Sequence, residues 1–307
     1  MKKDKSSSKK PIIQKPQSSI LEIPQVPELP YEHKDWEDLT IADDYMFKLV
    51  MSHKRICKHL LEMILGIKIR KLMEPKTEHA MKNSYESRGI RLDVYVEDDE
   101  NTIYDVEMQV RKYSEAYFGR RTRYYQSVID FGALQAGVEY NQLKKSIIIF
   151  ICPFKIFDGQ RHLYTFRNIC QQNKKLQLDD GSQKIFLSTK GNLRDVNAKV
   201  LNFLKFIDGL PVKDKWVDEL QDLITALKTN EREKANYMTY QMKIAEERDE
   251  ARAEGRAEGR AEGRAEGEDK LSRLIARLLE MGKNDEILSA TKNATLRNQL
   301  YEKYSIV

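Results

Sequence analysis

The chain has 307 residues, of which 40% are hydrophobic and 33% are charged, so it is polar but long enough to bury the core of one or two domains. Basic residues exceed acidic residues by only five, 53 against 48, which neither demonstrates nor excludes nucleic-acid binding. The longest apolar run, Ile147 to Cys152, is far shorter than the roughly 20 residues of a membrane-spanning helix. We therefore expect no membrane partner.

The cysteines and the missing nucleotide motifs narrow the class of protein further. Cys57, Cys152 and Cys170 form no CxxC pair, which favours a reducing, cytoplasmic location over a disulfide scaffold. The basic start of the chain is followed by no apolar segment, so no secretory signal is expected. The sequence contains neither a GxxxxGK[ST] loop nor a GxSxG elbow, so nucleotide hydrolysis and serine hydrolysis of those types are not expected.

The first segment of the chain is rich in proline. Five of the eight prolines lie within residues 1–30, among scattered serines and lysines. Such a composition buries too little apolar surface to offset the entropy lost on ordering. Residues 1–35 are therefore predicted to form a disordered arm.

Helices and strands alternate after this arm. Apolar residues recur at helical spacing over 44–65, and Gly66 predicts the end of that helix. The run Asp98-Asp99-Glu100-Asn101 has the composition of a turn and separates two strand-like runs, which predicts a hairpin. The elements expected in chain order are a helix over 44–65, strands over 67–73, 90–97 and 103–110, a helix over 115–137, a strand over 146–152, weaker strands over 162–167 and 184–187, and a helix over 196–207. This order predicts an α/β domain over residues 36–215, in which helices cover a mixed sheet.

The remainder of the chain is expected to be helical. Residues 216–268 form a predicted spacer that carries an Ala-Glu-Gly-Arg repeat, with copies starting at Ala253, Ala257 and Ala261. The repeat has no apolar stripe beyond alanine, so we expect a marginal, exposed helix and no coiled coil.

A small helical tail is predicted over residues 269–307. Leucine and isoleucine recur on one helical face before Gly282, and a second helix is expected from about Asp285. The short core favours an oligomerisation or docking role over a DNA-reading helix-turn-helix. We therefore expect a homo-oligomer formed through the C-terminal helices.

The predicted hairpin carries the residues with chemistry. Because side chains alternate across a strand, the even-numbered apolar residues of its first strand (92, 94 and 96) are expected on one face and Asp93 on the opposite, polar face. If residues 98–102 close a regular hairpin, paired residue numbers sum to 200, which places Asp93 directly opposite Glu107. Two facing carboxylates about 5 Å apart repel each other.

Two interpretations of this carboxylate pair remain at this point. A hard divalent cation such as Mg²⁺ would offset the repulsion, since it prefers one or two carboxylates together with waters and phosphate oxygens. The other interpretation is a solvated face of the sheet that happens to be acidic.

A set of short motifs resembles the PD-(D/E)XK nucleases, and within them the Rpn family of recombination-promoting, transposase-like nucleases. Asp93, followed on the next strand by Glu107-Met108-Gln109, is similar to the D…ExK constellation. The set also includes Asp44-Tyr45-Met46-Phe47-Lys48 as a first-helix DxxFK element, Arg120–Gln126 as a post-core helix, Ser146–Phe150 followed by Pro153-Phe154 as the next strand, and the C-terminal Gly/Glu/Arg repeat. Leu92 replaces the usual proline, and Gln109 replaces the lysine.

The resemblance implies a fold, a cofactor and roles for individual residues. It implies a restriction-endonuclease-like mixed sheet flanked by helices and followed by a helical C-terminal extension. Asp93 and Glu107 are expected to bind Mg²⁺, with the carbonyl of Met108 as a further ligand, and Gln109 is expected to position the attacking water. Asp44 is expected either as an outer carboxylate or as an N-cap. The resemblance also implies DNA phosphate contacts from the post-core helix, through Arg120, Arg121, Arg123 and Gln126, although a solvated basic face is the alternative.

These observations favour one function and leave one alternative. The first hypothesis is a cytoplasmic, Mg²⁺-dependent DNA endonuclease that hydrolyses phosphodiester bonds and is associated with DNA recombination or mobile elements. The alternative is a non-catalytic nucleic-acid- or protein-binding relative that retains the nuclease fold. Gln109 in place of lysine favours the alternative, because glutamine carries no charge, whereas the retained carboxylates favour catalysis.

Overall fold

A computed structural model describes residues 34–82, 88–134 and 137–306 of the chain. Residues 1–33 of the predicted disordered arm lie outside the described residues. The first described element is a short 3-10 helix, η1 (Trp36–Asp38), whose tryptophan is buried in the core. A second 3-10 helix is η2 (Tyr140–Gln142).

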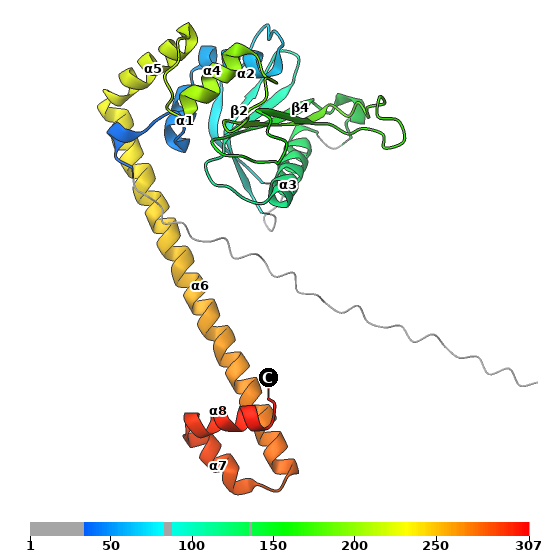
Figure 1. Cartoon of the computed structure of the whole chain (residues 1–307), viewed down its shortest axis with the longest axis vertical. Helices are drawn as coiled ribbons and strands as arrows, with labels where there is room; N and C mark the ends of the chain where they lie inside the picture. Colours follow the sequence, from blue (N-terminus) through cyan, green and yellow to red (C-terminus); the bar gives the residue numbers. More distant parts are fainter. Residues whose placement is uncertain (1–33, 83–87, 135–136, 307) are drawn as a thin grey trace, which may run out of the picture. The chain divides into compact units, whose positions relative to one another are not determined.

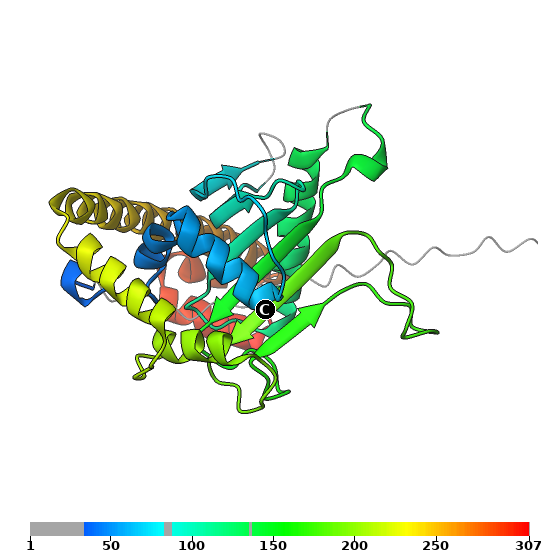
Figure 2. The ribbon, with the colours of Figure 1, turned by 90° about the horizontal axis from the view of Figure 1, so that it is seen from above.

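The centre of the fold is a six-stranded mixed sheet (Figures 1 and 2). Its strand order is β1-β2-β3-β4-β6-β5. β3, β4 and β6 run parallel, whereas β1, β2 and the edge strand β5 pair in antiparallel fashion. The strand bounds are β1 (Lys76–Met81), β2 (Ile90–Glu97), β3 (Ile103–Met108), β4 (Ser146–Cys152), β5 (Leu163–Phe166) and β6 (Ser182–Ser188).

Helices cover both faces of the sheet, as the sequence predicts for this fold class. α3 packs on one face, where Phe118 and Tyr125 join a cluster with Phe150 and Phe186. The other face is covered by α1, α2, α4 and α5 around a larger apolar core. The bounds of these helices are α1 (Asp44–Met51), α2 (Lys54–Leu65), α3 (Glu115–Ala133), α4 (Ala198–Ile207) and α5 (Lys215–Lys228).

The hairpin β2–β3 has the predicted register. Val94 pairs with Val106 and Glu97 with Ile103, so paired residue numbers sum to 200. The carboxylate of Asp98 holds the turn, because its Oδ1 accepts hydrogen bonds from the backbone N–H groups of Glu100 and Thr102, each at 2.9 Å. The turn therefore sets a register that brings position 93 opposite position 107.

Several predicted elements differ in extent or place; among the smaller differences, the helix expected over 115–137 ends at Ala133 and the strand expected over 103–110 ends at Met108. The strand expected over 67–73 is wrong, since that segment contributes only an isolated bridge from Leu72 to Asp98, and β1 follows it instead. The helix expected over 44–65 is two helices, because the chain leaves helical geometry at His53, which has extended φ and ψ. Gly66 ends the second helix as predicted, in a left-handed conformation with φ 67°. The tail has one helix more than expected.

The prediction that residues 92, 94 and 96 share one face is also wrong. Leu92 packs in the cluster under α3, whereas Val94 and Val96 belong to the core on the other face. The change of face falls at Asp93. Across from it on β1, Glu78 has φ 52°, a left-handed conformation that a regular strand does not adopt. The local distortion turns the side chains that follow Leu92 to the opposite face.

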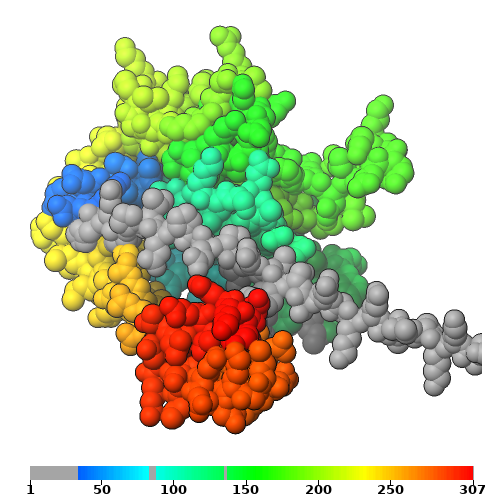
Figure 3. Space-filling model, turned by 60° about the horizontal axis from the view of Figure 1, so that its bottom comes forward, coloured from blue at the N-terminus to red at the C-terminus, as the bar shows by residue number. Residues whose placement is uncertain are grey.

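The C-terminal part of the chain is helical, as predicted. α6 (Glu231–Glu280) is continuous over 50 residues, about 75 Å at 1.5 Å per residue, and includes the exposed Ala-Glu-Gly-Arg repeat. α7 (Asn284–Lys292) and α8 (Ala294–Lys303) pack against the end of α6 and form a small cluster around Leu274, Leu278, Ala290 and Leu300 (Figure 3, orange to red). In the described segments, no helix combines the length and the apolar character needed to span a bilayer.

The boundary proposed after residue 215 remains a prediction. α5 begins there, yet Trp216, Leu220 and Ile224 of that helix are buried in the same core as α1 and α2. Tyr237, in the second turn of α6, is buried in this core as well. The helices that follow residue 215 thus contribute to the α/β domain before α6 continues into the repeat.

Candidate active site

The predicted carboxylate pair lies where β2 and β3 separate. Regular pairing ends at Val94 and Val106. Beyond this point the backbone N–H of Asp93 donates to Oε1 of Glu107 at 3.0 Å, and the backbone N–H of Met108 donates to Oδ2 of Asp93 at 3.2 Å. Each carboxylate thus accepts a backbone N–H group of the opposite strand, in the place of a backbone carbonyl in a regular ladder. The structure places Asp93, Glu107 and Met108 together at one point of the hairpin.

The interpretation of this pair as part of a solvated acidic face is wrong, because α3 covers the site. Glu107 is only 2% exposed and Gln109 is 7% exposed. A buried carboxylate needs a partner, and α3 supplies one: Nη2 of Arg121 lies 2.7 Å from Oε2 of Glu107. The cluster is therefore a buried ionic network between the sheet and a helix.

Arg121 contacts two of the predicted catalytic residues, Glu107 and Gln109. Besides Glu107, it donates from Nη1 to Oε1 of Gln109 at 2.5 Å and from Nη2 to the hydroxyl of Tyr125 at 2.7 Å. The other end of the Gln109 amide donates to the carbonyl of Arg111 at 2.5 Å. Both polar ends of Gln109 are thus bound to protein groups. Arg121 was expected to contact DNA, but its contacts here hold the carboxylate site.

The other residues expected to bind DNA are arranged differently. Arg120 and Arg123 are exposed on α3, in keeping with the expected basic face. The side chain of Gln126 is buried and donates to Oδ1 of Asp130 at 2.8 Å, and it also donates to the hydroxyl of Ser146. Its amide group therefore links α3 to β4 inside the domain.

A third carboxylate, that of Asp105, belongs to the cluster and was missed in the sequence. It is completely buried, and neither of its oxygens accepts a hydrogen bond from any described residue. Strand parity was the available signal, because position 105 lies on the same face of β3 as position 107. The negative charge of Asp93 and the positive charge of Arg121 both act on it.

Lys48 on α1 is a second residue whose role the sequence did not reveal. Its Nζ lies 2.7 Å from Oδ2 of Asp44 and 2.9 Å from Oε1 of Glu78, and it is 6% exposed. Tyr240 of α6 donates to the same Asp44 oxygen at 3.0 Å, and Lys48 lies over its ring. Asp44 occupies the first position of α1 and Asp43 is the N-cap, so the N-cap alternative for Asp44 is wrong. The i, i+4 spacing of Asp44 and Lys48 was the feature of the sequence that could have predicted their ion pair.

Burial and crowding shift the pKa values of these groups. Burial, and then the negative charges of Glu107 and Asp44, raise the pKa of Asp93 well above its usual range. Burial, and then the charge of Asp105, likewise raise the pKa of Glu107. Burial alone would lower the pKa of Lys48, but the charges of Asp44 and Asp93 outweigh it, so that pKa is raised. Added positive charge would therefore stabilise the carboxylates in their ionised form.

The donor set suits a hard divalent cation only in part. Asp93 and Glu107 are adjacent carboxylates, and Mg²⁺ is commonly bound by one or two carboxylates with several waters. No group of three His, Cys, Asp or Glu side chains in the described ranges converges as a ready metal cage. Both oxygens of Glu107 already accept hydrogen bonds, although each carboxylate oxygen has a further lone pair. An ion at this point would thus depend on water for most of its ligands.

A carboxylate pair held where two strands of a mixed sheet diverge, beside a lysine and an arginine, defines a site suited to metal-assisted phosphoryl chemistry. The family model of the PD-(D/E)XK nuclease family transposases matches residues 41–262, and the chain belongs to this family. This finding confirms the resemblance drawn from the sequence and the expected α/β fold. Comparisons with curated proteins and with solved structures give no match. PD-(D/E)XK nucleases generally use divalent metal ions, and the family implies a nuclease- or transposase-like role with DNA as substrate.

Proposed function

We propose that this protein is a Mg²⁺-dependent DNA endonuclease associated with recombination or mobile elements. Asp93 and Glu107 hold the metal in this proposal, and the carbonyl of Met108 is a further ligand. The observation that supports it best is the reciprocal bonding at the end of the hairpin, where each carboxylate accepts a backbone N–H of the opposite strand. These bonds fix both side chains before any ligand arrives, as preorganised catalysis requires.

The charges around the site also support a divalent cation. Asp93, Asp105 and Glu107 are three buried or half-buried carboxylates, and among the residues that the structure describes Arg121 is the one cation that forms an ion pair with any of them. Lys48 acts on Asp93 through its charge but forms its ion pairs with Asp44 and Glu78. Excess negative charge in a site of low polarity is costly unless it is protonated or neutralised. A divalent cation would neutralise it.

The residues of the chain have separate tasks in the proposed reaction. When bound, the metal lowers the pKa of a water and offsets charge on the phosphate. Gln109 lies two residues after Glu107, and its amide is held by Arg121 and by the carbonyl of Arg111. Its second amide hydrogen and its second carbonyl lone pair are left to orient a water, which it cannot ionise because it carries no charge. Lys48 supplies the positive charge near Asp93 that the glutamine at position 109 does not supply.

Nicking of supercoiled plasmid by the purified full-length protein tests this function. We expect relaxed plasmid with Mg²⁺ and none with EDTA. Asp93→Asn and Glu107→Ala should reduce nicking to the background of the assay, while Glu100→Gln, an exposed acid of the same hairpin, should nick like the wild type. Equal nicking by Asp93→Asn and the wild type would contradict the assignment of the site.

One observation favours the second candidate function, a non-catalytic DNA-binding relative. Both oxygens of Glu107 are occupied by the Asp93 N–H and by Arg121, and Gln109 stands at the position of the usual lysine. A protein of this kind would bind DNA with or without Mg²⁺ and would leave the plasmid supercoiled. The same assay, combined with a gel-shift measurement in Mg²⁺, separates the two functions.

A further inference from the structure

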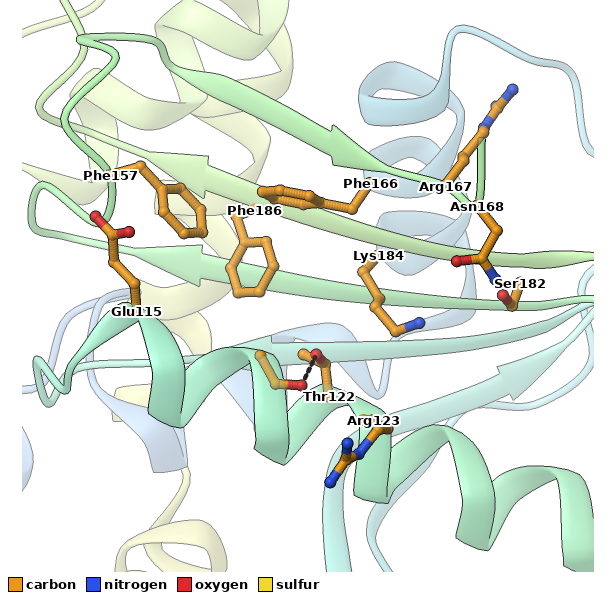
Figure 4. Close-up of a pocket in the computed structure, with 11 residues that line it drawn as sticks. Glu115, Thr122, Arg123, Phe157, Phe166, Arg167, Asn168, Ser182, Lys184 and Phe186 are labelled. Carbon is orange, nitrogen blue, oxygen red and sulfur yellow. Dashed lines mark hydrogen bonds between the residues drawn. The ribbon is translucent and has the colours of Figure 1, made fainter. Parts of the chain in front are cut away.

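A pocket of about 640 Å³ lies between α3 and the edge strand β5 with its neighbour β6 (Figure 4). This volume falls within the roughly 300–1,000 Å³ that is typical of small-ligand sites. None of the residues assigned to the carboxylate site as a metal ligand lines it. The pocket has one aromatic and one cationic end, and these two ends suggest the chemistry of its ligand.

Three phenylalanines form the aromatic end. Phe157 precedes β5, Phe166 ends β5, and Phe186 lies on β6. Their ring centroids are 5.3 to 5.7 Å apart, and Phe186 meets each of the other two rings edge to face. Phe166 is 45% exposed, which is high for an aromatic side chain that has apolar neighbours. An exposed ring face in a pocket is available for stacking with a flat ligand.

The cationic end is formed by Arg123 of α3, Lys184 of β6 and Arg167, the residue after β5. None of the three forms an ion pair with a carboxylate among the described residues. Within the described part of the chain, Arg167 donates only to the amide oxygens of Gln177 and Gln183, at 3.4 and 3.2 Å. The one carboxylate in the lining, Glu115, lies beside Phe157, at the opposite end of the pocket (Figure 4). The cationic end is therefore suited to an anion.

Strand parity explains why these side chains converge. Lys184 and Phe186 are two residues apart on β6 and so share the face that looks toward α3. Phe166 pairs with Lys184 across the β5–β6 ladder. On the helix side Gly119 leaves the space open, since a Cβ built there would meet no atom within 4 Å. The pocket is thus a consequence of a glycine on α3 facing an aromatic edge of the sheet.

The same helix also carries Arg121 of the carboxylate site. Arg121 and Arg123 are two residues apart and lie on opposite flanks of the face of α3 that packs on the sheet. A helix with its side chains is about 10 Å across, so the two sites are separated by a distance that a short stretch of nucleic-acid strand can span. A strand whose phosphodiester lies at the carboxylates can thus place a neighbouring nucleotide in the pocket.

We propose that this pocket binds one nucleotide of a DNA strand with an unpaired base. The base stacks on the exposed ring of Phe166, with Phe157 against its edge, and its phosphate is bound by Arg123, Lys184 and Arg167. A bare phosphate would leave the aromatic end unused, and a purely apolar ligand would leave three cations without an ion-paired anion. This inference rests on the proposed function, because it takes DNA as the substrate.

Direct binding of single-stranded DNA tests the pocket without any cleavage. The full-length protein is titrated in EDTA against a fluorescent 12-nucleotide single strand, and the dissociation constant is measured by anisotropy. We expect Phe166→Ala to weaken binding about tenfold, in the range found for loss of one base–aromatic stack. Gly119→Leu, which fills the pocket without deleting a contact, should weaken binding similarly.

The matched control is Phe131→Ala, which removes an exposed phenylalanine of the same helix outside the pocket. We expect this variant to bind within twofold of the wild type, with melting curves confirming that all three variants are folded. Lys184→Ala should reduce the slope of log K against log salt by about 0.7, the value for one phosphate contact to a single strand. Wild-type binding by both Phe166→Ala and Gly119→Leu would overturn the proposal.

Two further arms identify which part of the ligand binds and where it comes from. An oligonucleotide with abasic units should bind the wild type more weakly than the intact strand does. The Phe166→Ala variant should bind the two oligonucleotides equally well, because it has already lost the stacking ring. Competition by a deoxynucleoside monophosphate at the same affinity would assign the pocket to free nucleotides, and no competition would assign it to a DNA strand. The binding assay contains no metal, so a failure of plasmid nicking would contradict the proposed nuclease function and leave the binding result valid. A failure of single-strand binding would overturn the proposal for the pocket and leave the proposed nuclease function untouched.

Discussion

Arg121 on α3 donates to Glu107 on β3 at 2.7 Å, across the layer between the helix and the sheet. The same guanidinium lies over the rings of Tyr125 and Phe150, at 4.9 and 5.0 Å from their centroids, so its flat faces are packed and its edges are hydrogen bonded. The pair thus joins the candidate catalytic carboxylate to the packing of the domain. Changes at Arg121 should affect stability and metal response together.

We expect Arg121→Met to lower the free energy of unfolding by about 3 kcal/mol in EDTA, because it leaves a buried carboxylate without its partner. Methionine retains much of the stem that packs on Tyr125 and Phe150. Mg²⁺ should recover part of the loss, since Glu107 is then free to bind it. Urea unfolding with EDTA or Mg²⁺ measures both effects. Arg120→Met, an exposed position of the same helix, should change stability by less than about 0.5 kcal/mol.

Gln109→Lys is expected to reduce stability by about 1–2 kcal/mol and to leave nicking no faster than in the wild type. Lysine is the usual residue of the family motif at this position, but here it would remove the acceptor of Arg121 and add a second cation beside it. The double variant Gln109→Lys/Arg121→Gln exchanges the two side chains, so the site again contains one cation and one amide. Recovery of stability by the double variant, measured by urea unfolding, would verify this reason; a stable, faster single variant would refute it.

Lys48→Met should abolish nicking and cost about 3 kcal/mol of stability, because Asp44 and Glu78 lose their ion pairs and the buried carboxylate of Asp93 loses the positive charge near it. Adding Glu78→Gln removes one of the unpaired charges and should recover part of the stability. Nicking should not recover, since the positive charge near Asp93 is still missing. Thermal melting and plasmid nicking on the same preparations distinguish this outcome from a purely structural role, in which both would recover.

The register of the hairpin and the main elements of the sheet were predictable because local patterns determine them. The turn after Glu97 and strand parity were sufficient to place Asp93 opposite Glu107. β1 was missed because Lys76–Met81 contains one β-branched residue and no apolar alternation. The change of face at Asp93 was hidden as well, since it depends on the left-handed conformation of Glu78 on a neighbouring strand.

The partners of the charged residues were the part of the site that the sequence did not contain. Arg121 is one of three arginines within four residues, and only the packing of α3 on the sheet decides which of them meets Glu107. Lys48 was visible within a family motif, but its approach to Asp93 depends on how α1 crosses the sheet. Asp105 had the correct parity, yet no local signal distinguished a buried from a solvated carboxylate.

The pH dependence of stability should reveal Asp105. Burial, and then the charge of Asp93, raise the pKa of Asp105 in the folded state, so the folded protein holds a proton that the unfolded chain releases above about pH 4. Where the folded state binds more protons than the unfolded state, the free energy of unfolding falls as pH rises. This decline begins near the unfolded pKa of about 4 and continues up to the raised pKa of the folded state. We expect Asp105→Asn to weaken this decline and to raise the melting temperature relative to the wild type most at pH 8. Asp158→Asn, an exposed control, should leave the pH profile unchanged.

The glycines of the repeat offer a test of α6 by itself. At Gly255, Gly259, Gly263 and Gly267 an added Cβ would meet no atom within 4 Å, and all four lie in exposed helix. Alanine costs less backbone entropy in a helix, so each replacement should stabilise α6 by about 0.5–1 kcal/mol. Circular dichroism at 222 nm should show helix that persists to higher temperature, with plasmid nicking unchanged.

Gly282→Ala is the opposite control: its φ of 66° is left-handed, so alanine there should destabilise the turn between α6 and α7. Loss of nicking in the fourfold alanine variant would show that the repeat must bend, which contradicts its interpretation as a simple spacer.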